Sequence, residues 1–240
     1  MPSSLFVSDL HLTEARPEAN EKFFSFIEET ASRATSLYIL GDLFEYWIGD
    51  DDLDEPFHAV IAGFLRRLSD SGIALGVMQG NRDFLMGERF CSATGARLLP
   101  DPTVIELGAA RTLLTHGDTL CTDDHDYQAW RQTAHSGSWQ REFLSQSRSR
   151  RREAILDLRA KSRSAIRRKP PEIMDVNADA VRQAFREHGA STMIHGHTHK
   201  PGHHIHEVDG RRCERWVLPD WYGPGGYLEL SGQHARLVRF

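Results

Sequence analysis

The sequence contains no apolar run that approaches the roughly 18 residues of a membrane-spanning helix. It has only three cysteines, Cys91, Cys121 and Cys213, and no CxxC pair. Three distant cysteines suit reduced thiols in the cytosol better than a disulfide framework. No signal peptide is expected either, because residues 4–12 (SLFVSDLHL) already have the pattern of a structural strand. We therefore expect a cytosolic protein.

Two common catalytic motifs are also missing from the chain. There is no GxSxG motif around a nucleophilic serine and no Walker phosphate-binding loop. The hydrophobic fraction of 40% and the charged fraction of 26% are ordinary for a globular protein, and 240 residues can bury a sizeable core. Any chemistry must therefore come from other residue types.

The charge is unevenly distributed. The formal net charge is −5, yet residues 148–169 hold ten Lys and Arg residues against only Glu153 and Asp157. This local excess of +8 leaves −13 for the rest of the chain. A basic segment on an acidic body indicates an anionic partner at one place, which could be nucleic acid, an anionic membrane or a phosphorylated small molecule.

The hydrophobic pattern predicts an α/β fold. Short apolar strands are expected at residues 4–9, 36–42 and 73–81, with helical periodicity at 21–33 and 54–70. Strands that alternate with helices in this way are typical of βαβ units around a parallel sheet.

The second half of the chain returns to this pattern after an interruption. Residues 104–118 predict a hairpin, and residues 177–189 predict a helix that Gly189 caps. Strands are expected at residues 191–196, 216–220, 227–230 and 235–240. Between the hairpin and the helix, residues 123–171 have helical composition and contain the basic segment. We predict one domain, residues 1–240, with these residues as a helical insertion, called the lid below.

Each predicted strand of the core ends in a possible metal ligand. In open α/β sheets, ligands bind beyond the carboxyl ends of the strands. These strand-end residues are Asp9 and His11 (DLH), Asp42 (GD), Asn81 (GN), His116 (HGD), and His197 and His199 (GHTH). One such coincidence is uninformative, but five in order predict a metal centre. The glycines beside them, at 41, 80, 117 and 196, would permit sharp turns.

The order D-x-H, G-D, G-N, H-G-D, G-H-T-H resembles the calcineurin-like metallophosphoesterases from Asp9 to His199. The resemblance implies an αββα sandwich with two metal ions. The first ion would bind Asp9, His11, Asp42 and His199, and the second Asp42, Asn81, His116 and His197, with Asp42 bridging. His195 would be the last strand residue or a supporting contact. Carboxylate, amide and imidazole ligands without thiolate suit manganese, iron or zinc, and the resemblance favours Mn²⁺.

Two such ions activate a water for in-line attack on phosphorus, so no nucleophilic side chain is needed. We expect Asp42, Asn81, Arg82 and His116 to be catalytic. Many calcineurin-like metallophosphoesterases have a histidine after G-N, whereas this chain has Arg82. Arginine cannot shuttle a proton, but its fork suits two phosphate oxygens. The alternative is that Arg82 only pairs with Asp83 on the surface.

Longer motifs narrow the resemblance. LYILGDLFEYWIGDDD, GNRDFLMG, HGDTLCTDD and EIMDVN are similar to the calcineurin-like UDP-2,3-diacylglucosamine pyrophosphatases of lipid A biosynthesis. That resemblance implies attack at the α-phosphorus, giving UMP and 2,3-diacylglucosamine 1-phosphate (lipid X), at the cytoplasmic face of the inner membrane. The substrate-contact positions it implies are Asn81, Arg82, Asp124, Ser162, Ile166, Lys169 and His197. Asp123 is expected to support the loop instead.

The lid fits a lipid substrate and a lipid surface. Its apolar residues are Trp139, Phe143, Leu144, Ile155, Leu156 and Leu158. Basic amphipathic helices lie on anionic membranes, and a purely structural lid would not need ten cations. The alternative is that the apolar residues only seat the lid on the core.

Two rival functions stay open at this point. One is a phosphodiesterase or nuclease, whose basic segment would follow a nucleic-acid backbone. The other is a metal-poor scaffold for protein binding, although all seven ligand residues are present. We expect no nucleic acid, because the cations are confined to one insertion of an acidic chain, and no obligate protein partner is evident from the sequence.

Overall fold

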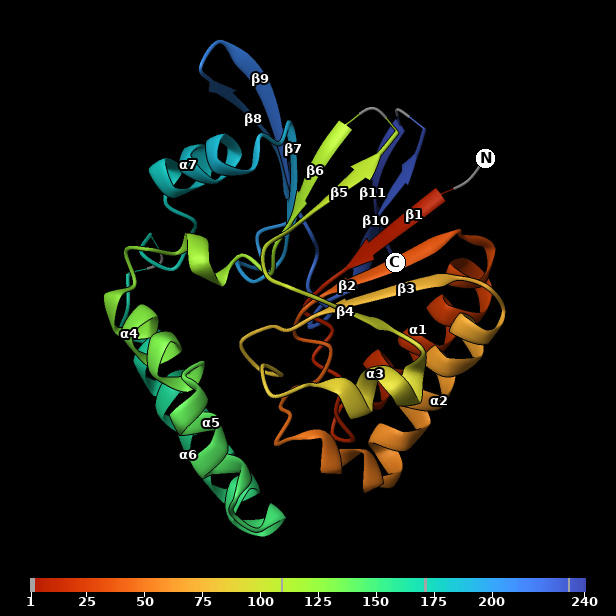
Figure 1. Cartoon of the computed structure of the whole chain (residues 1–240), viewed down its shortest axis with the longest axis vertical. Helices are drawn as coiled ribbons and strands as arrows, with labels where there is room; N and C mark the ends of the chain where they lie inside the picture. The colour runs from red at the N-terminus through yellow and green to blue at the C-terminus, as the bar shows by residue number, and fades with distance from the viewer. Residues whose placement is uncertain (1–2, 109, 171, 233) are drawn as a thin grey trace.

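Two β-sheets packed face to face form the centre of the protein (Figure 1). This computed structural model describes residues 3–108, 110–170, 172–232 and 234–240, without the side chain of Ile166. The first sheet has the spatial order β11 (His234–Arg239), β10 (Gly226–Ser231), β1 (Ser3–Val7), β2 (Ser36–Leu40), β3 (Ala74–Met78), β4 (Arg97–Leu99). The second has the order β5 (Thr103–Leu107), β6 (Ala110–Leu114), β7 (Thr192–His195), β9 (Arg211–Val217), β8 (Gly202–Val208).

The first sheet is antiparallel at one edge, where β10 and β11 lie, and the second sheet is antiparallel at both edges. Strands β1 to β4 run parallel, as do β6, β7 and β9. The β5–β6 pair is the predicted hairpin, with Thr103 opposite Leu114. Because parallel neighbours end at the same edge, the segments that follow β1, β2 and β3 come out side by side, as do those after β6 and β7.

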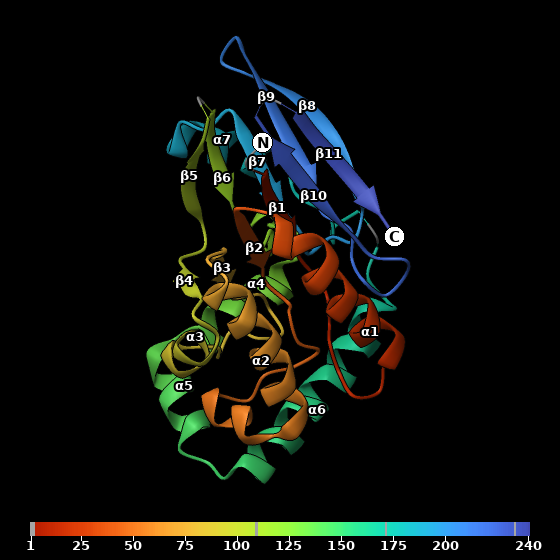
Figure 2. The ribbon, with the colours of Figure 1, turned by 90° about the vertical axis from the view of Figure 1, so that its right-hand side faces the viewer.

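Alternation along the strands builds three apolar layers. Leu5 and Val7 of β1 face helices α1 (Pro17–Ser25), α2 (Pro56–Asp70) and α3 (Glu88–Thr94), whereas Phe6 between them faces the other sheet. Helix α1 continues through a π-helical turn, Phe26–Thr30, and a 3-10 turn, Ala31–Arg33. These helices cover the outer face of the first sheet (Figure 2).

Helix α7 (Ala178–His188) covers the outer face of the second sheet, with Val181 and Phe185 buried there. Asn177 caps its start by accepting from two backbone N–H groups, and Gly189 ends it at φ 59°. The layers are thus helix, sheet, sheet, helix. The predicted αββα sandwich and the predicted helix before Gly189 are both confirmed.

The predicted lid contains three helices that form an elongated arm beside the core (Figure 1). They are α4 (His125–Ala134), α5 (Gly137–Leu144) and α6 (Arg148–Ile166), and the side chains of Asp124, Ser136 and Ser147 cap their N-termini. Pro171, at the predicted boundary, lies outside the described residues. Over the described part of the chain, none of the helices combines the length and the apolar character that crossing a bilayer takes.

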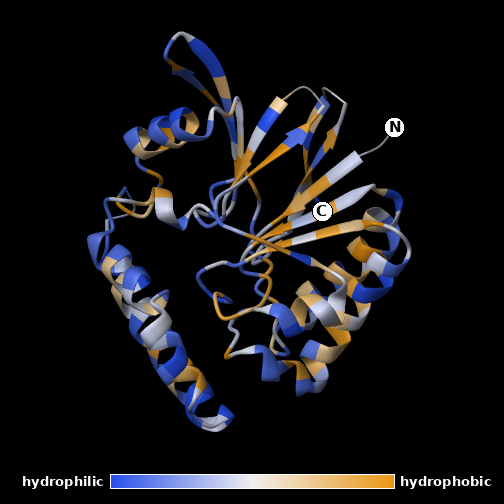
Figure 3. Cartoon of the chain, viewed as in Figure 1, coloured by the Kyte–Doolittle hydropathy of each residue, from blue (hydrophilic) through white to orange (hydrophobic). Residues whose placement is uncertain are grey.

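The apolar residues of the lid divide between the two predicted roles. Phe143 and Ile155 are buried, and Trp139 and Leu158 pack against the same core, so these four seat the lid. Leu144 and Leu156 are 44% and 48% exposed. Along the arm in Figure 3, hydrophilic residues predominate and apolar residues are scattered among them.

The cations of the lid have a structural use that the sequence did not indicate. Arg148 and Arg152 donate to the carboxylates of Glu55 and Asp52, Arg151 binds Asp51, and Arg159 binds Glu45. Most of these partners belong to a 3-10 turn, Asp50–Asp54, and the residue after it. Four of the ten cations thus hold the lid to the core, and the expectation that a structural lid would not need all ten stays a prediction. The nuclease alternative loses much of its support, because these arginines face the core.

Candidate metal centre

The strand ends bring all seven predicted ligands into one cluster at the edge of the two sheets. Asp9 and His11 follow β1, Asp42 follows β2, Asn81 follows β3, His116 follows β6, and His197 and His199 follow β7. Backbone bonds join neighbouring segments, from Asp9 N to Gly41 O at 3.1 Å and from Gly196 N to His116 O at 2.9 Å. We call these seven residues the ligand cluster.

The first half of the cluster contains the residues predicted for the first metal. His11 Nε2 lies 3.4 Å from His199 Nε2, 3.9 Å from Asp9 Oδ1 and 3.8 Å from Asp42 Oδ2. His199 Nε2 lies 3.3 Å from Asp9 Oδ1. Ligand atoms of Asp9, His11 and His199 are close enough together to hold one ion.

The second half of the cluster contains the residues predicted for the second metal, and its two imidazoles lie next to Asn81. Its Oδ1 lies 3.0 Å from His116 Nε2 and 3.0 Å from His197 Nδ1, and His116 Nε2 lies 3.8 Å from Asp42 Oδ1. His116 Nδ1 donates to the backbone oxygen of Leu40 at 2.9 Å, which turns Nε2 toward the cluster. Asp42 contributes one oxygen to each half, as a bridging ligand requires.

The backbone of the cluster is strained. Among the described residues, six non-glycine residues have a positive φ, and five of them are predicted ligands: Asp9, His11, Asp42, His197 and His199. Their φ values lie between 50° and 66°, a region that residues with a Cβ rarely adopt. Strain of this kind persists where the surroundings hold a functional geometry.

Two of the predicted glycines leave room for carboxylates. A Cβ on Gly80 would collide with Oδ1 of Asp42, and a Cβ on Gly196 would collide with Ser8 and with Oδ2 of Asp9. Neither has a positive φ. The expected sharp turn therefore does not explain why these two positions are glycine. Glycine is required because the side chain of a predicted ligand lies too close to leave room for a Cβ.

Carboxylates also hold the backbone of the motifs. Asp83 is fully buried and accepts from the backbone N–H groups of Gly80 at 2.8 Å and Leu43 at 2.8 Å, which ties the second motif to the third. Asp9 Oδ2 accepts from the N–H of His197 at 2.8 Å and so ties the first motif to the last. The alternative that Arg82 pairs with Asp83 on the surface is wrong, because Asp83 faces inward.

Burial and the charges of neighbouring side chains compete in setting the pKa values of the cluster. Burial raises the pKa of Asp42 to about 7, although His116 opposes this. Burial alone would lower the pKa of His116, but the carboxylates of Asp42 and Asp9 outweigh it and raise that pKa to about 9. Burial and the nearby His116 lower the pKa of His197 to about 4, so its imidazole is neutral near pH 7. Two carboxylates so far from water favour added positive charge.

The cluster fits divalent cations. Oδ1 of Asp9 is buried and has no hydrogen-bond partner among the described residues. The oxygen and imidazole donors around it, with no thiolate within the set, are ligands that divalent transition metals take. The arrangement can hold divalent metal, although binding by each separate residue stays a prediction.

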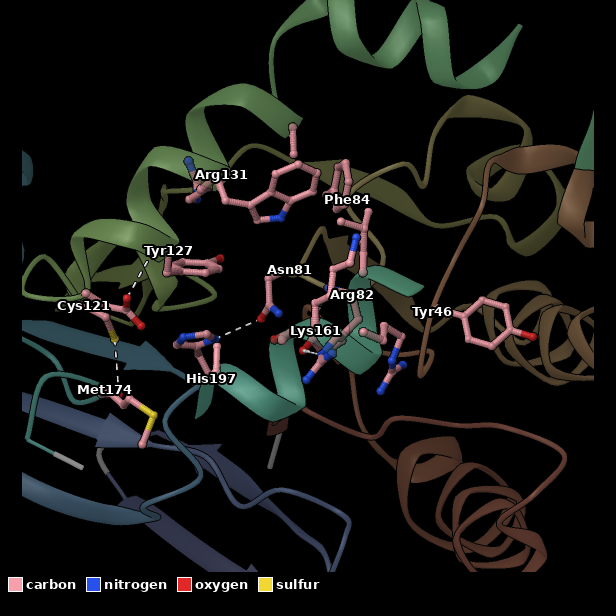
Figure 4. Close-up of a pocket in the computed structure, with 18 of the residues that line it drawn as sticks. Tyr46, Asn81, Arg82, Phe84, Cys121, Tyr127, Arg131, Lys161, Met174 and His197 are labelled. Carbon is pink, nitrogen blue, oxygen red and sulfur yellow. Dashed lines mark hydrogen bonds and ion pairs between the residues drawn. The ribbon is translucent and has the colours of Figure 1, made fainter. Parts of the chain in front are cut away.

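A cavity of about 500 Å³ opens from the ligand cluster to the lid (Figure 4). Asn81 and Arg82 lie at its centre, with His197 and Tyr127 on one side and Tyr46 on the other. The apolar lining residues include Phe84, Trp130, Ala134, Ile155, Leu158, Ala165 and Met174. The cationic ones are Arg82, Arg131, Arg159, Lys161 and Lys169.

The predicted substrate contacts of the lid reach this cavity as far as they are described. Asp124, Ser162 and Lys169 line it, and the side chain of Ile166 lies outside the described part. Lys169 Nζ donates to Asp124 at 2.5 and 2.7 Å, so the two close one wall together. Asp123 accepts from Asn177 at 3.1 Å, as expected of a residue that supports the loop.

His195 lies outside the ligand cluster. It is the last residue of β7 and fully buried, and its Nε2 accepts from Arg215 at 3.0 Å. Burial and the Arg215 charge lower its pKa to about 3. The prediction of a strand-end residue is confirmed. His203, His204 and His206 lie on β8, the outermost strand of the second sheet, away from the seven ligands.

Asp118 and its partners Tyr127 and Arg131 were not predicted from the sequence as part of the site. Asp118, in the H-G-D motif, is buried, binds the hydroxyl of Tyr127 and accepts from Arg131 Nε at 2.7 Å. It thereby fixes the first helix of the lid beside His197, whose ring centroid lies 5.8 Å from that of Tyr127. The H-G-D motif could have indicated Asp118, because it contains an aspartate that is not among the predicted metal ligands.

Comparison with known proteins agrees with this geometry. Residues 3–201 match the calcineurin-like phosphoesterase family. A protein of Aromatoleum aromaticum named UDP-2,3-diacylglucosamine hydrolase is 49% identical over 96% of this chain and 94% of its own length. Proteins of that name are 46% identical in Pseudomonas paraeruginosa, over 99% of both chains, and 44% identical in Cellvibrio japonicus, over 95% of both.

These matches extend over nearly the full length of both partners, so the resemblance is not confined to short motifs. Together with the αββα layers and the cluster of aspartate and histidine side chains, they indicate a metal-dependent hydrolase. The chain belongs to the calcineurin-like phosphoesterases and, within them, to the family of the UDP-2,3-diacylglucosamine hydrolases.

Proposed function

We propose that this protein hydrolyses the diphosphate of UDP-2,3-diacylglucosamine. Water adds to the α-phosphorus, the bond to the bridging oxygen breaks, and the products are UMP and 2,3-diacylglucosamine 1-phosphate (lipid X). The names of relatives 44–49% identical over nearly their full length support this substrate.

The observation that carries the proposal is the composition of the cavity. One continuous space joins the ligand cluster to cationic side chains and then to an apolar wall between core and lid. A diphosphate needs the first two surroundings and acyl chains need the third. A nuclease substrate has no use for the apolar wall.

We propose that the seven residues of the ligand cluster hold two divalent ions and that these are Mn²⁺. The mixed oxygen and nitrogen donors fit manganese, as they do iron and zinc. When bound, two such ions activate a water and neutralise charge on the phosphoryl oxygens. Asp42, which touches both halves of the cluster, would fix them relative to each other.

The residues around the ions would bind and orient the substrate. The N–H of Arg82 donates to Asp42 Oδ1 at 2.8 Å, which leaves its guanidinium in the cavity to bind the diphosphate with a two-pronged contact. Asn81, His116 and His197 would border the reacting phosphoryl group. Lys169, Asp124, Ser162 and Ile166 would contact the sugar 1-phosphate from the lid.

We also propose that the protein works at the cytoplasmic face of the inner membrane as a peripheral protein. Leu144 and Leu156 of the lid are exposed, and so are Arg150, Arg163, Arg167 and Arg168 near them in sequence. Exposed leucines among arginines are typical of a surface that meets anionic lipid.

The direct test is product analysis with two substrates. The purified protein and Mn²⁺ would be incubated with UDP-2,3-diacylglucosamine or with UDP-N-acetylglucosamine, and the products identified by mass spectrometry. We expect UMP and the lipid phosphate from the first, and about 10²-fold slower turnover of the second, because it leaves the apolar wall empty. Equal turnover of both, or cleavage of neither, would overturn the proposed substrate.

A further inference from the structure

Glu45 lies directly beside a predicted metal ligand. It follows Asp42 by three residues, and its N–H donates to Leu12 O at 3.1 Å, while His11 N donates to Asp42 O at 2.9 Å. Because of these backbone bonds, the segment after β2 lies alongside the segment after β1. The carboxylate of Glu45 therefore comes to lie next to the ring of His11.

The two ring nitrogens of His11 face different surroundings. Nε2 points into the ligand cluster, toward Asp9, Asp42 and His199. Nδ1 points away from it and is buried without a hydrogen-bond partner among the described residues, and Glu45 Oε2 lies 3.4 Å from it. The side chain of His11 is 1% exposed, and among the described residues the carboxylate that lies beside Nδ1 is that of Glu45. A carboxylate behind the imidazole is the usual way in which a metal-ligating histidine is oriented and its tautomer fixed.

Three further contacts hold Glu45 in place. Arg159 of α6 donates to its carboxylate and to its backbone oxygen. The hydroxyl of Tyr222 donates to Glu45 Oε2 at 2.7 Å, and the ring of Tyr222 stacks on His11 with centroids 4.6 Å apart. The lid and the segment after β9 thus meet at Glu45, immediately behind His11.

We propose that Glu45 is a positioning residue that accepts from Nδ1–H of His11 and so presents Nε2 to the first metal position. Arg159 links this contact to the lid, so that seating of the lid and affinity for metal depend on each other. The inference rests on the ligand set proposed above.

The chain provides a closely matched control. Arg151, two helical turns before Arg159 on α6, makes the same kind of contact with the core: it donates to Ile48 O and to the carboxylate of Asp51. Neither Asp51 nor Arg151 lines the cavity or contacts a ligand residue among the described contacts. Asp51→Asn therefore weakens the lid seat without touching His11, whereas Glu45→Gln does both.

The experiment is a titration of metal-free protein with MnCl₂, in which free Mn²⁺ is read by electron paramagnetic resonance. Wild type, His11→Ala, Glu45→Gln, Asp51→Asn and Arg159→Met would be compared, each first checked for folding by circular dichroism. We expect one of two ions to bind about 10–100-fold more weakly in Glu45→Gln, and not in Asp51→Asn. Arg159→Met should have a smaller effect that disappears in the Glu45→Gln background.

Two results would overturn the inference. One is wild-type binding of both ions by Glu45→Gln in a series in which His11→Ala loses one. The other is an equal loss in Asp51→Asn and Glu45→Gln, which would assign the effect to the lid seat alone. If His11→Ala still binds both ions, the proposed ligand set fails instead. Should Glu45→Gln not fold, Tyr222→Phe removes one donor to Glu45 and keeps the ring, and unchanged Mn²⁺ binding there would count against the inference.

Discussion

The ligand cluster and the lid are held to the core by different kinds of contact. The cluster residues stand at the ends of neighbouring strands, and carboxylates that accept from backbone N–H groups fix them, as Asp83 and Asp9 do. The lid is attached through long arginine side chains, such as Arg151 and Arg159, that reach acidic residues about 100 positions away. The first kind of contact fixes the backbone around the site, whereas the second depends on long side chains that join distant parts of the chain.

The contacts also differ in how strongly salt weakens them. Backbone bonds to a buried carboxylate and the ion pairs of the buried Arg151 and Arg159 are little affected by salt, whereas the more exposed pairs of Arg148 and Arg152 with Glu55 weaken as the salt concentration rises. A change in the ligand cluster should therefore abolish the chemistry, and a change in the lid should alter substrate binding. The predictions below test that division.

Asp42→Asn is expected to have the largest effect. Asp42 contacts both halves of the cluster, so loss of its charge should release metal and lower kcat by about 10³-fold or more. Metal content by mass spectrometry and turnover of the lipid substrate would measure this. Asp179→Asn, at an exposed position in α7, is the control and should behave as wild type. Full metal content in Asp42→Asn would contradict the role of the cluster.

Arg82→Lys separates chemistry from metal binding within the cluster region. Lysine keeps the charge but loses the fork that two phosphate oxygens need, so kcat should fall by about 10²-fold. Mn²⁺ binding should be unchanged, because the side chain of Arg82 is not in the ligand set. Steady-state kinetics and a Mn²⁺ titration measure the two quantities. A loss of metal together with activity would show that Arg82 supports the cluster instead.

Arg151→Met tests the lid side of the comparison. The variant leaves Asp51 and the carbonyl of Ile48 without their partner, which should loosen the lid. We expect KM for the lipid substrate to rise about three- to tenfold with kcat nearly unchanged, since the lost energy concerns binding of substrate and transition state alike. If kcat fell by the same factor, the lid would contribute to the chemical step as well, and the division of roles between ligand cluster and lid would be wrong.

Arg167→Ala should have the smallest effect, and only on a lipid surface. One basic residue near an anionic membrane contributes about 1 kcal/mol, so binding to phosphatidylglycerol vesicles should weaken about fivefold. Sedimentation with vesicles measures this, and Arg97→Ala, exposed at the start of β4, is the control. If the two variants bind vesicles equally well, the exposed face of the lid is not the membrane contact.

The hydrophobic pattern predicted the parallel strands, their helices and the assembly of the ligand cluster because these follow from short-range rules, whereas the sandwich of two sheets was implied only by the family resemblance. Apolar alternation places Leu5 and Val7 on one face of the sheet and Phe6 on the other, and parallel strands deliver their last residues to one edge. The sequence alone therefore predicts that Asp9, Asp42 and Asn81 meet.

The contacts of the lid could not be predicted in the same way. The pairing of Arg159 with Glu45, or of Arg151 with Asp51, depends on where a helical arm folds back, and no local pattern encodes that distance. The ten cations consequently suggested an external anion, although four of them bind the acidic core. Asp83 was misassigned for a related reason: a charged residue in a loop is usually exposed, and here four backbone N–H groups made burial possible.

The central claim is that water, activated at the ligand cluster, attacks the α-phosphorus of a lipidated UDP-sugar. Hydrolysis of UDP-2,3-diacylglucosamine with Mn²⁺ in ¹⁸O-water, with both products weighed by mass spectrometry, tests it most directly. The account predicts one ¹⁸O atom in UMP and none in the lipid phosphate. Label in the lipid phosphate would contradict it, because the attack would then fall on the other phosphorus.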